Sequence, residues 1–241
     1  MQNGLYVGLS AQTSLARRLE TIADNVANMS TVGYRSSGIS FAAEVVKTGD
    51  RQTSFAGPGT EYLSLRAGAL VRTDNSLDLA IQGDSWFAVK GTNGAAYTRD
   101  GRMRISESGS LETLSGGKVL DAGGAPIVLD AAAGPPVIAE DGMISQGGRR
   151  YGAIGLFMIP ENAKLTRTEN SAVVPDTPAK AALDFTRNRM VQGWVEQSNV
   201  NPIVEMTKLI SVTRSFDGVS AGLSEMDVSL QDAIKTLGGQ A

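Results

Sequence analysis

The sequence contains neither histidine nor cysteine. These two residue types supply most transition-metal ligands, most general bases that act near neutral pH, and the thiol nucleophile. Their absence excludes most kinds of catalytic site and any disulfide framework. A carboxylate pair, a lysine or an oxygen-only site for Mg²⁺ or Ca²⁺ is still compatible with the composition, but no pair of carboxylates stands out for such a role. We therefore expect no catalytic residues, no metal site and no cofactor.

Long hydrophobic runs and a strong excess of one charge are also missing. The most apolar run, Ile154 to Ile159, is far shorter than the ~20 residues that a membrane-spanning helix needs. No basic residue precedes Arg17, so the N-terminal segment does not resemble a cleaved signal peptide. With 22 basic and 25 acidic residues the net charge is -3, which offers no general attraction to phosphate backbones. We expect no membrane span and no nucleic-acid partner.

The composition is nevertheless that of a folded protein. Hydrophobic residues make up 41% of the 241 residues, whereas aromatic residues make up only 5% and glycines number 28. This is enough apolar material for one or two domains with mainly aliphatic cores. The many glycines favour tight turns, and hence β-rich structure combined with long helices elsewhere.

The N-terminal residues 1–35 are predicted to form a long amphipathic helix. Apolar residues recur mostly at three- and four-residue steps from Leu5 to Met29, and no proline intervenes. Gly33 would end the helix, because glycine adopts the left-handed conformation at little cost. The residues of the stripe that we assign to an assembly interface are Leu5, Leu9, Leu19, Ile22 and Val26.

The middle of the chain has a different pattern. Residues 36–65 include a polar stretch with Gly57-Pro58-Gly59 and are predicted to be a linker or extended loop. Residues 66–192 alternate short apolar runs with turn signals such as Asn93-Gly94 and Asp141-Gly142. This alternation predicts a central antiparallel β-rich domain.

Residues 193–241 are predicted to contain a short segment followed by a second long helix. Asn201 is a favourable N-cap, and Pro202 occupies the first helical position, where a missing N–H is not needed. Beyond them apolar residues follow a heptad pattern, with a second series three residues after the first. The residues of this second candidate interface are Leu209, Val212, Phe216, Val219, Leu223, Met226, Leu230 and Leu237.

Both apolar stripes are too narrow to cover a broad sheet. The simplest alternative is that the helices cover one side of a monomeric core, but the heptad regularity favours packing on each other or on neighbouring subunits. The predicted fold class is α+β. Long N- and C-terminal heptad helices form an α-helical, coiled-coil-like domain, and an antiparallel β-rich domain lies between them in the sequence.

Two local motifs have ordinary structural interpretations. Gly218 to Gly222 matches the G-x-S-x-G nucleophile elbow, but that motif needs a strand before it and a histidine elsewhere. We interpret it as a chance match inside a helix. The basic cluster of Arg99, Arg102 and Arg104 is interpreted as a solvated strand face, and Trp86 as a core residue.

The segments that flank the two helices resemble the flagellar rod and hook protein family. Ala23 to Arg35 is similar to the family's A-N-N-x-A-N-x-x-T-x-G-[FY]-[KR] signature, with Asp24 in place of the usual asparagine. Gly193 to Met206 resembles the second signature, and Leu77 to Asp84 and Tyr97 to Gly101 resemble the family's β domain. The resemblance thus covers nearly the whole chain. The signature residues are Asn25, Asn28, Thr31, Gly33, Ser198, Asn199, Asn201, Pro202 and Glu205.

This resemblance implies a structural subunit whose terminal helices bundle with those of other copies and other rod proteins. Together they would form a torque-transmitting, export-conducting axial tube in the rod of the flagellar basal body, which crosses the periplasm. Such a subunit is made in the cytoplasm and exported by the flagellar export apparatus without a cleaved signal peptide. The chain length and the Asp84-x-Trp86 variant are more similar to the proximal rod protein than to the distal one. A distal rod or hook protein is the alternative within the family, and a cell-wall carbohydrate-binding β protein is the alternative from another class.

Overall fold

The computed structural model describes residues 2–41, 43–48, 51–57, 59–91, 94–168 and 171–239; for residues 2–3, 43–48, 51–56, 230 and 237 it describes the backbone alone. The chain forms two compact units. The first contains Met1–Ala27, Ser37–Tyr62 and Asn201–Ala241, and the second contains Asn28–Ser36 and Leu63–Val200.

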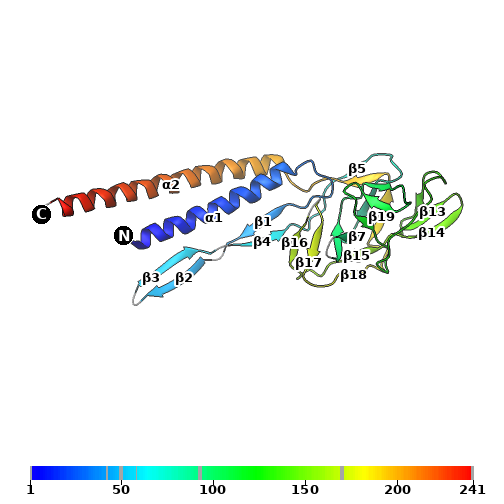
Figure 1. The fold of residues 1–241 in the computed structure, drawn as a ribbon, viewed down its shortest axis with the longest axis horizontal. Helices are drawn as coiled ribbons and strands as arrows, with labels where there is room; N and C mark the ends of the chain where they lie inside the picture. The colour runs from blue at the N-terminus through cyan, green and yellow to red at the C-terminus, as the bar shows by residue number, and fades with distance from the viewer. Residues whose placement is uncertain are drawn as a thin grey trace. The chain divides into compact units, whose positions relative to one another are not determined.

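The first unit is built on two helices that run side by side, α1 (Gln2–Ala27) and α2 (Pro202–Gly238) (Figure 1). Close to the middle of α1, Gln12 Nε2 donates a hydrogen bond to Ser220 Oγ at 3.2 Å. Near its end, Asn25 Nδ2 donates to Glu205 Oε2 at 3.2 Å. Because rising residue numbers in α1 meet falling numbers in α2, the two helices are antiparallel.

The helix ends show how local sequence sets the boundaries. The side chain of Asn201 accepts hydrogen bonds from the backbone N–H groups of Ile203 and Val204 at 3.1 and 3.2 Å, and Pro202 occupies the first turn. The predicted start of the second helix is therefore confirmed. The first helix ends at Ala27, earlier than predicted, because residues 28–33 form turns instead. Gly33 is left-handed as expected, with φ 70, but it lies beyond the helix.

Strands occupy the part of the first unit where the sequence predicts a linker or extended loop. The antiparallel pair β2 (Ala43–Thr48) and β3 (Arg51–Ala56) forms one ribbon, and β1 (Ser37–Ser40) pairs with β4 (Thr60–Leu63). Strand pairing uses backbone N–H and C=O groups, which a polar sequence supplies as well as an apolar one. The composition of residues 36–65 therefore did not exclude strands, and that expectation is corrected here.

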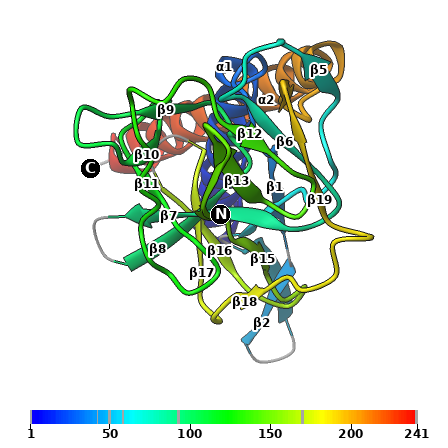
Figure 2. The same ribbon diagram turned by 90° about the vertical axis from the view of Figure 1, so that its right-hand side faces the viewer.

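The second unit is β-rich, which confirms the α+β class with a β-rich central region (Figure 2). The largest sheet among its described residues has the order β16-β17-β8-β7-β11-β10-β9, with β15 pairing to β7 and β18. Smaller sheets have the order β12-β13-β14, β19-β6 and β20-β5. The strands are β5 (Leu70–Arg72), β6 (Leu79–Gln82), β7 (Trp86–Gly91), β8 (Gly94–Thr98), β9 (Met103–Ile105), β10 (Leu111–Thr113), β11 (Lys118–Val119), β12 (Val137–Ile138), β13 (Met143–Gln146), β14 (Arg149–Ala153), β15 (Leu156–Met158), β16 (Leu165–Arg167), β17 (Val173–Pro175), β18 (Lys180–Ala181), β19 (Arg189–Gln192) and β20 (Trp194–Glu196).

Strand β7 is buried on both of its faces. Phe87 and Val89 belong to the main apolar core, whereas Trp86 and Ala88 belong to a second, smaller cluster. Successive side chains of a strand point to opposite faces, so one strand contributes to both clusters. The assignment of Trp86 to a core is confirmed, since it is 3% exposed.

The sequence predicts neither a membrane-spanning helix nor a metal site, and the structure tests both expectations within the described ranges. None of the helices in those ranges is both long and apolar enough to span a bilayer. Across the same residues, no group of three or more carboxylates is placed to share a metal ion.

Gly33 gives a prediction about stability. A methyl group at this left-handed position would collide with the backbone of Arg99 and Asp100, so Gly33→Ala should destabilise the second unit beyond the ~1–2 kcal/mol cost of the left-handed conformation itself. Gly116→Ala is the matched control, because Gly116 has φ 89 and an added Cβ would meet no atom within 4 Å. Urea unfolding followed by tryptophan fluorescence measures both variants. Equal losses would contradict this account of Gly33.

Candidate functional site

Most of the predicted interface residues are buried or partly buried along α1 and α2. Ile22 on α1 and Val212 on α2 are buried, at 4% and 5% exposure. The remaining members are partly buried, and they recur on α2 at steps of three and four residues. Those partly buried residues are Leu19, Val26, Leu209, Phe216, Val219, Leu223 and Met226.

Two glycines of α1 lie directly against large apolar side chains of α2. A Cβ added at Gly8 would lie 2.5 Å from Leu223 Cδ2, and one added at Gly4 would lie 2.9 Å from the terminal methyl carbon of Met226. Because glycine has no side chain, the helices approach closely here. Leu223 and Met226 are thereby packed against the backbone of α1.

The other predicted interface residues are placed differently. Leu5 is 37% exposed and Leu9 is 53% exposed, so both lie on the outside of the helix pair. Leu230 and Leu237 belong to α2, but their side chains lie outside the described part of the chain.

Asn25 connects three segments of the first unit. Its side-chain amide donates to the carbonyl oxygen of Ser37 and accepts from the N–H of the same residue, both at 2.9 Å. The same Nδ2 donates to Glu205 Oε2, and Lys208 Nζ donates to Glu205 Oε1 at 2.6 Å. Asn25 and Glu205 are 2% and 6% exposed. The two signatures therefore meet at a buried polar contact between α1 and α2.

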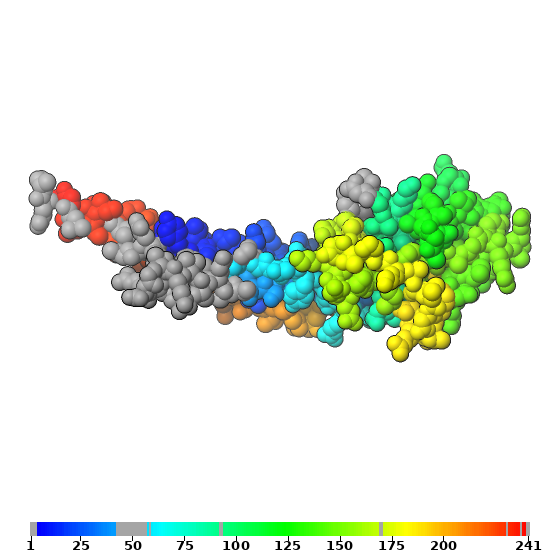
Figure 3. Space-filling view, turned by 90° about the horizontal axis from the view of Figure 1, so that it is seen from below, coloured from blue at the N-terminus to red at the C-terminus, as the bar shows by residue number. Residues whose placement is uncertain are grey.

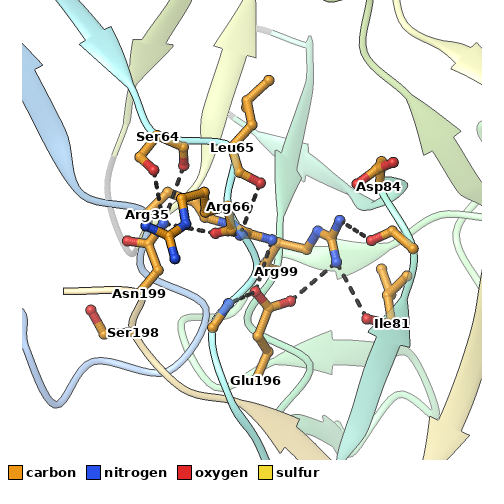
Figure 4. Close-up of polar contacts among 12 residues, drawn as sticks. Arg35, Ser64, Leu65, Arg66, Ile81, Asp84, Arg99, Glu196, Ser198 and Asn199 are labelled. Atoms are coloured by element: carbon orange, nitrogen blue, oxygen red, sulfur yellow. Dashed lines mark hydrogen bonds and ion pairs between the residues drawn. The ribbon is translucent and has the colours of Figure 1, made fainter. Parts of the chain in front are cut away.

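Asn199 plays a similar part in the second unit (Figure 4). Its Oδ1 accepts from the N–H of Ser36 at 2.7 Å. Its Nδ2 donates to the carbonyl oxygens of Ser64 and Arg66 at 3.3 and 2.8 Å. One amide side chain thus links three stretches that are far apart in the sequence.

Two further signature residues, Thr31 and Ser198, make local hydrogen bonds. Thr31 Oγ1 donates to Asn28 Oδ1 at 3.1 Å, which closes the turn after α1. Ser198 Oγ accepts from the N–H of Val200 at 3.3 Å. These bonds satisfy turn backbone and side-chain groups next to the helix ends.

A buried ionic cluster lies beside Asn199 (Figure 4). Glu196 accepts from two guanidinium groups, Arg35 Nη2 at 2.8 Å and Arg99 Nη1 at 3.1 Å, and from the N–H of Gly68 at 2.9 Å. The side chains of Arg35, Arg99 and Glu196 are only 2%, 2% and 1% exposed. Arg99 Nη2 also donates to the carbonyl oxygen of Gly83 at 2.6 Å. A single carboxylate therefore serves two buried cations.

An aromatic ring completes this cluster. The guanidinium carbons of Arg35 and Arg99 lie 5.7 and 5.4 Å from the centre of the Trp86 ring. Cations at this distance are attracted by the negative face of an aromatic ring, and the attraction is larger where water is excluded. Trp86 thus contributes to balancing the second positive charge.

Burial lowers the pKa of both arginines of the cluster. Burial lowers the pKa of Arg99 to about 10, although the charge of Glu196 acts in the opposite direction. Burial likewise lowers the pKa of Arg35, again opposed by Glu196. Arginine stays protonated in proteins, so both guanidinium groups carry a positive charge. Glu196 is ion-paired with both groups, and the charge of Asp84 also favours the charged form of each, so two carboxylates, the hydrogen bonds and the aromatic ring together stabilise the buried cations.

The cluster corrects one interpretation of the sequence. Arg99 does not belong to a solvated strand face, because it is buried against Glu196. Arg102 and Arg104 do lie partly exposed, and they pair with Asp100 at 2.7 Å and with Glu112 at 3.7 Å. Burial of a charged residue depends on a partner far away in the sequence, which local pattern does not reveal. The sequence did offer one indication that Glu196 has a buried charged partner, because Arg35 and Glu196 lie inside the two signature segments.

The arrangement is suited to holding chain segments together. Every charged side chain of the cluster already has a charged partner, and the chain has no histidine or cysteine to act as base or nucleophile. We therefore assign the cluster a structural role.

Removing the central carboxylate tests this role. Glu196→Gln removes the carboxylate that is ion-paired with two buried guanidinium groups, and we expect a loss of about 3–5 kcal/mol in the free energy of unfolding. Asp74→Asn is the control, because the Arg72–Asp74 pair is 67% and 71% exposed and should contribute less than about 1 kcal/mol. Urea titration of the full chain compares the two. A loss at Glu196 no larger than that at Asp74 would refute the assignment.

Three family models match the chain: "Flagella basal body rod protein" over residues 5–35, "Flagellar hook protein FlgE/F/G D1 domain" over residues 80–146, and "Flagellar basal body rod FlgEFG protein C-terminal" over residues 191–236. The chain is 46% identical to the flagellar basal-body rod protein FlgF of Mesorhizobium japonicum, over 100% of both chains. It is 44% identical to FlgF of Rhizobium meliloti over 99% of both chains, and 27% identical to the flagellar basal-body rod protein FlgG of Bacillus subtilis over 97% of this chain and 98% of that one. The chain belongs to the flagellar basal-body rod protein family.

Proposed function

We propose that the chain is a structural, non-enzymatic subunit of the flagellar basal-body rod, in its proximal part. The observation that carries this function is the full-length similarity to two FlgF proteins at 46% and 44% identity. Identity to FlgG of Bacillus subtilis is lower, at 27%, so the proximal rod is favoured over other axial positions.

The terminal helices supply the contacts through which the subunit assembles. They form an antiparallel pair, and most of α2 remains exposed beside the stripe that faces α1. A heptad stripe of this kind is typical of coiled-coil packing, and we propose that the pair bundles with the helices of neighbouring rod subunits to form the axial tube. The β-rich unit would lie outside the tube.

The route to the rod follows from the same proposal. A subunit of the basal-body rod must leave the cytoplasm to reach its place in the flagellum. We propose export by the flagellar export apparatus without cleavage of a signal peptide. The partners are then the export apparatus in transit, and further copies and other rod proteins after assembly.

The helix pair provides the test of this function. Leu223 packs against Gly8, so Leu223→Glu would bury a carboxylate without a partner and separate the helices. We expect the variant to be absent from purified basal bodies and the cells to lose motility. Ser224→Glu, at the neighbouring exposed position, should be incorporated normally. Immunoblotting of basal bodies decides the outcome, and normal incorporation of Leu223→Glu would refute assembly through the paired helices.

A further inference from the structure

A row of charged side chains crosses one face of the largest sheet. The strand register places Lys90 of β7 opposite Lys118 of β11. Lys118 is in turn opposite Glu112 of β10, and Glu112 is opposite Arg104 of β9. Residues directly opposite each other on neighbouring strands point to the same face of a sheet. Three cations and one carboxylate therefore lie side by side on four adjacent strands, and we refer to them as the cationic row.

The charges of the cationic row are not balanced within the part of the chain that the structure describes. Glu112 lies between Lys118 and Arg104, but its ion pair is with Arg104, at 3.7 Å. No ion pair of the described residues involves Lys90 or Lys118, and both lysines are exposed. On the other side of Lys90 the register places Ala95 of β8, which carries no charge. Two ammonium groups thus face each other without a counter-charge.

This pairing is unfavourable for folding. Like charges directly opposite each other in a sheet destabilise it, although salt screens the repulsion between exposed groups. The neighbouring exposed cations are arranged differently, because Arg102 pairs with Asp100 and Arg104 pairs with Glu112. An anion between Lys90 and Lys118 would be attracted by both ammonium groups and would remove their repulsion. The arrangement therefore favours binding of an anion over stability of the free chain.

The backbone that presents the two lysines is held by the apolar core. Ala88 and Leu120 lie two positions along the same strand paths as Lys90 and Lys118, so they are on the same face. Both are buried, and they belong to the smaller apolar cluster together with Tyr97. Figure 3 shows this teal-to-green part of the chain at the molecular surface. Core packing thus fixes the spacing of the two lysines, whose Cβ atoms are ~5 Å apart in such a pair.

The surroundings of the two lysines favour a carboxylate over a more highly charged anion. Glu112 belongs to the same row and would repel a phosphate group more strongly than a singly charged carboxylate. Two ammonium groups are enough to neutralise one or two carboxylates. Ala95 beside Lys90 offers an apolar contact for the methylene groups of a glutamate side chain. These features match an acidic segment of a polypeptide.

We propose that Lys90 and Lys118 form a docking site for an acidic segment of a protein partner, with one carboxylate of that segment lying between the two ammonium groups. Charge complementarity of this kind steers a partner and fixes its orientation. The site lies in the β-rich unit, and neither the helix pair nor the proposed function is needed for it. Its test therefore stands apart from the test of assembly through the paired helices.

NMR titration of the full-length chain tests the site. The side-chain signals of Lys90 and Lys118 are followed while tetraglutamate with capped ends is added at low salt. We expect both signals to shift along one saturation curve, because one carboxylate contacts both ammonium groups. In Lys118→Gln the Kd measured at Lys90 should rise by about fivefold or more, although Lys90 itself is unchanged. Circular dichroism checks that the variant is folded.

A matched control separates the site from general attraction between opposite charges. Lys180→Gln removes the same charge from β18, where the register places Lys180 opposite Met158, and it should leave the Kd unchanged. An equal rise in Lys180→Gln, or no shift of the Lys90 and Lys118 signals in the wild type, would overturn the proposal. So would an equal response to capped tetraglutamine, which has no charge. Tighter binding of tripolyphosphate than of tetraglutamate would overturn the assignment to an acidic protein segment.

Discussion

The buried carboxylate of Glu196 is the interaction on which the second unit depends. It accepts from Arg35, Gly68 and Arg99, which come from three separate stretches of the sequence. A charge that is buried without a partner is strongly destabilising. Displacing one of these stretches would therefore remove a partner from the buried charges and destabilise the others. The Trp86 ring lies against both guanidinium groups and belongs to the apolar cluster on one face of β7. The ionic cluster and the apolar core therefore stabilise the same part of the sheet.

The first unit is organised differently, because its helices bury only a narrow stripe. Ile22 on α1 and Val212 on α2 are buried, and Asn25 with Glu205 forms a polar contact between the helices at one end. Much of α2 is exposed, including apolar residues near its start. A long helix in water is stabilised mainly by packing of its apolar face. The described part of this unit thus leaves much of the helix surface uncovered.

The sequence was most informative where a rule depends on neighbouring residues. The N-cap at Asn201, the proline after it and the apolar period of each helix all act over a few residues. The structure has both predicted helices, although the first ends at Ala27, earlier than predicted. The strands between residues 37 and 63 were missed because pairing depends on a partner strand and not on apolar content. Arg99 was misjudged for a similar reason, since its counter-ion lies at position 196.

The sequence by itself determined the α+β class, the two terminal helices, the lack of histidine and cysteine chemistry, and the signature segments of the rod and hook family. The class, the helices and the missing side-chain chemistry follow from composition and short-range periodicity, whereas the signature segments were identified by their resemblance to the family. Only the tertiary structure decided that Glu196 joins Arg35 to Arg99, that Asn199 ties together the backbones of Ser36, Ser64 and Arg66, and that Leu5 and Leu9 remain exposed. These features depend on which distant residues share a buried environment, because burial changes the free energy of a charge or a methyl group far more than local backbone preference does.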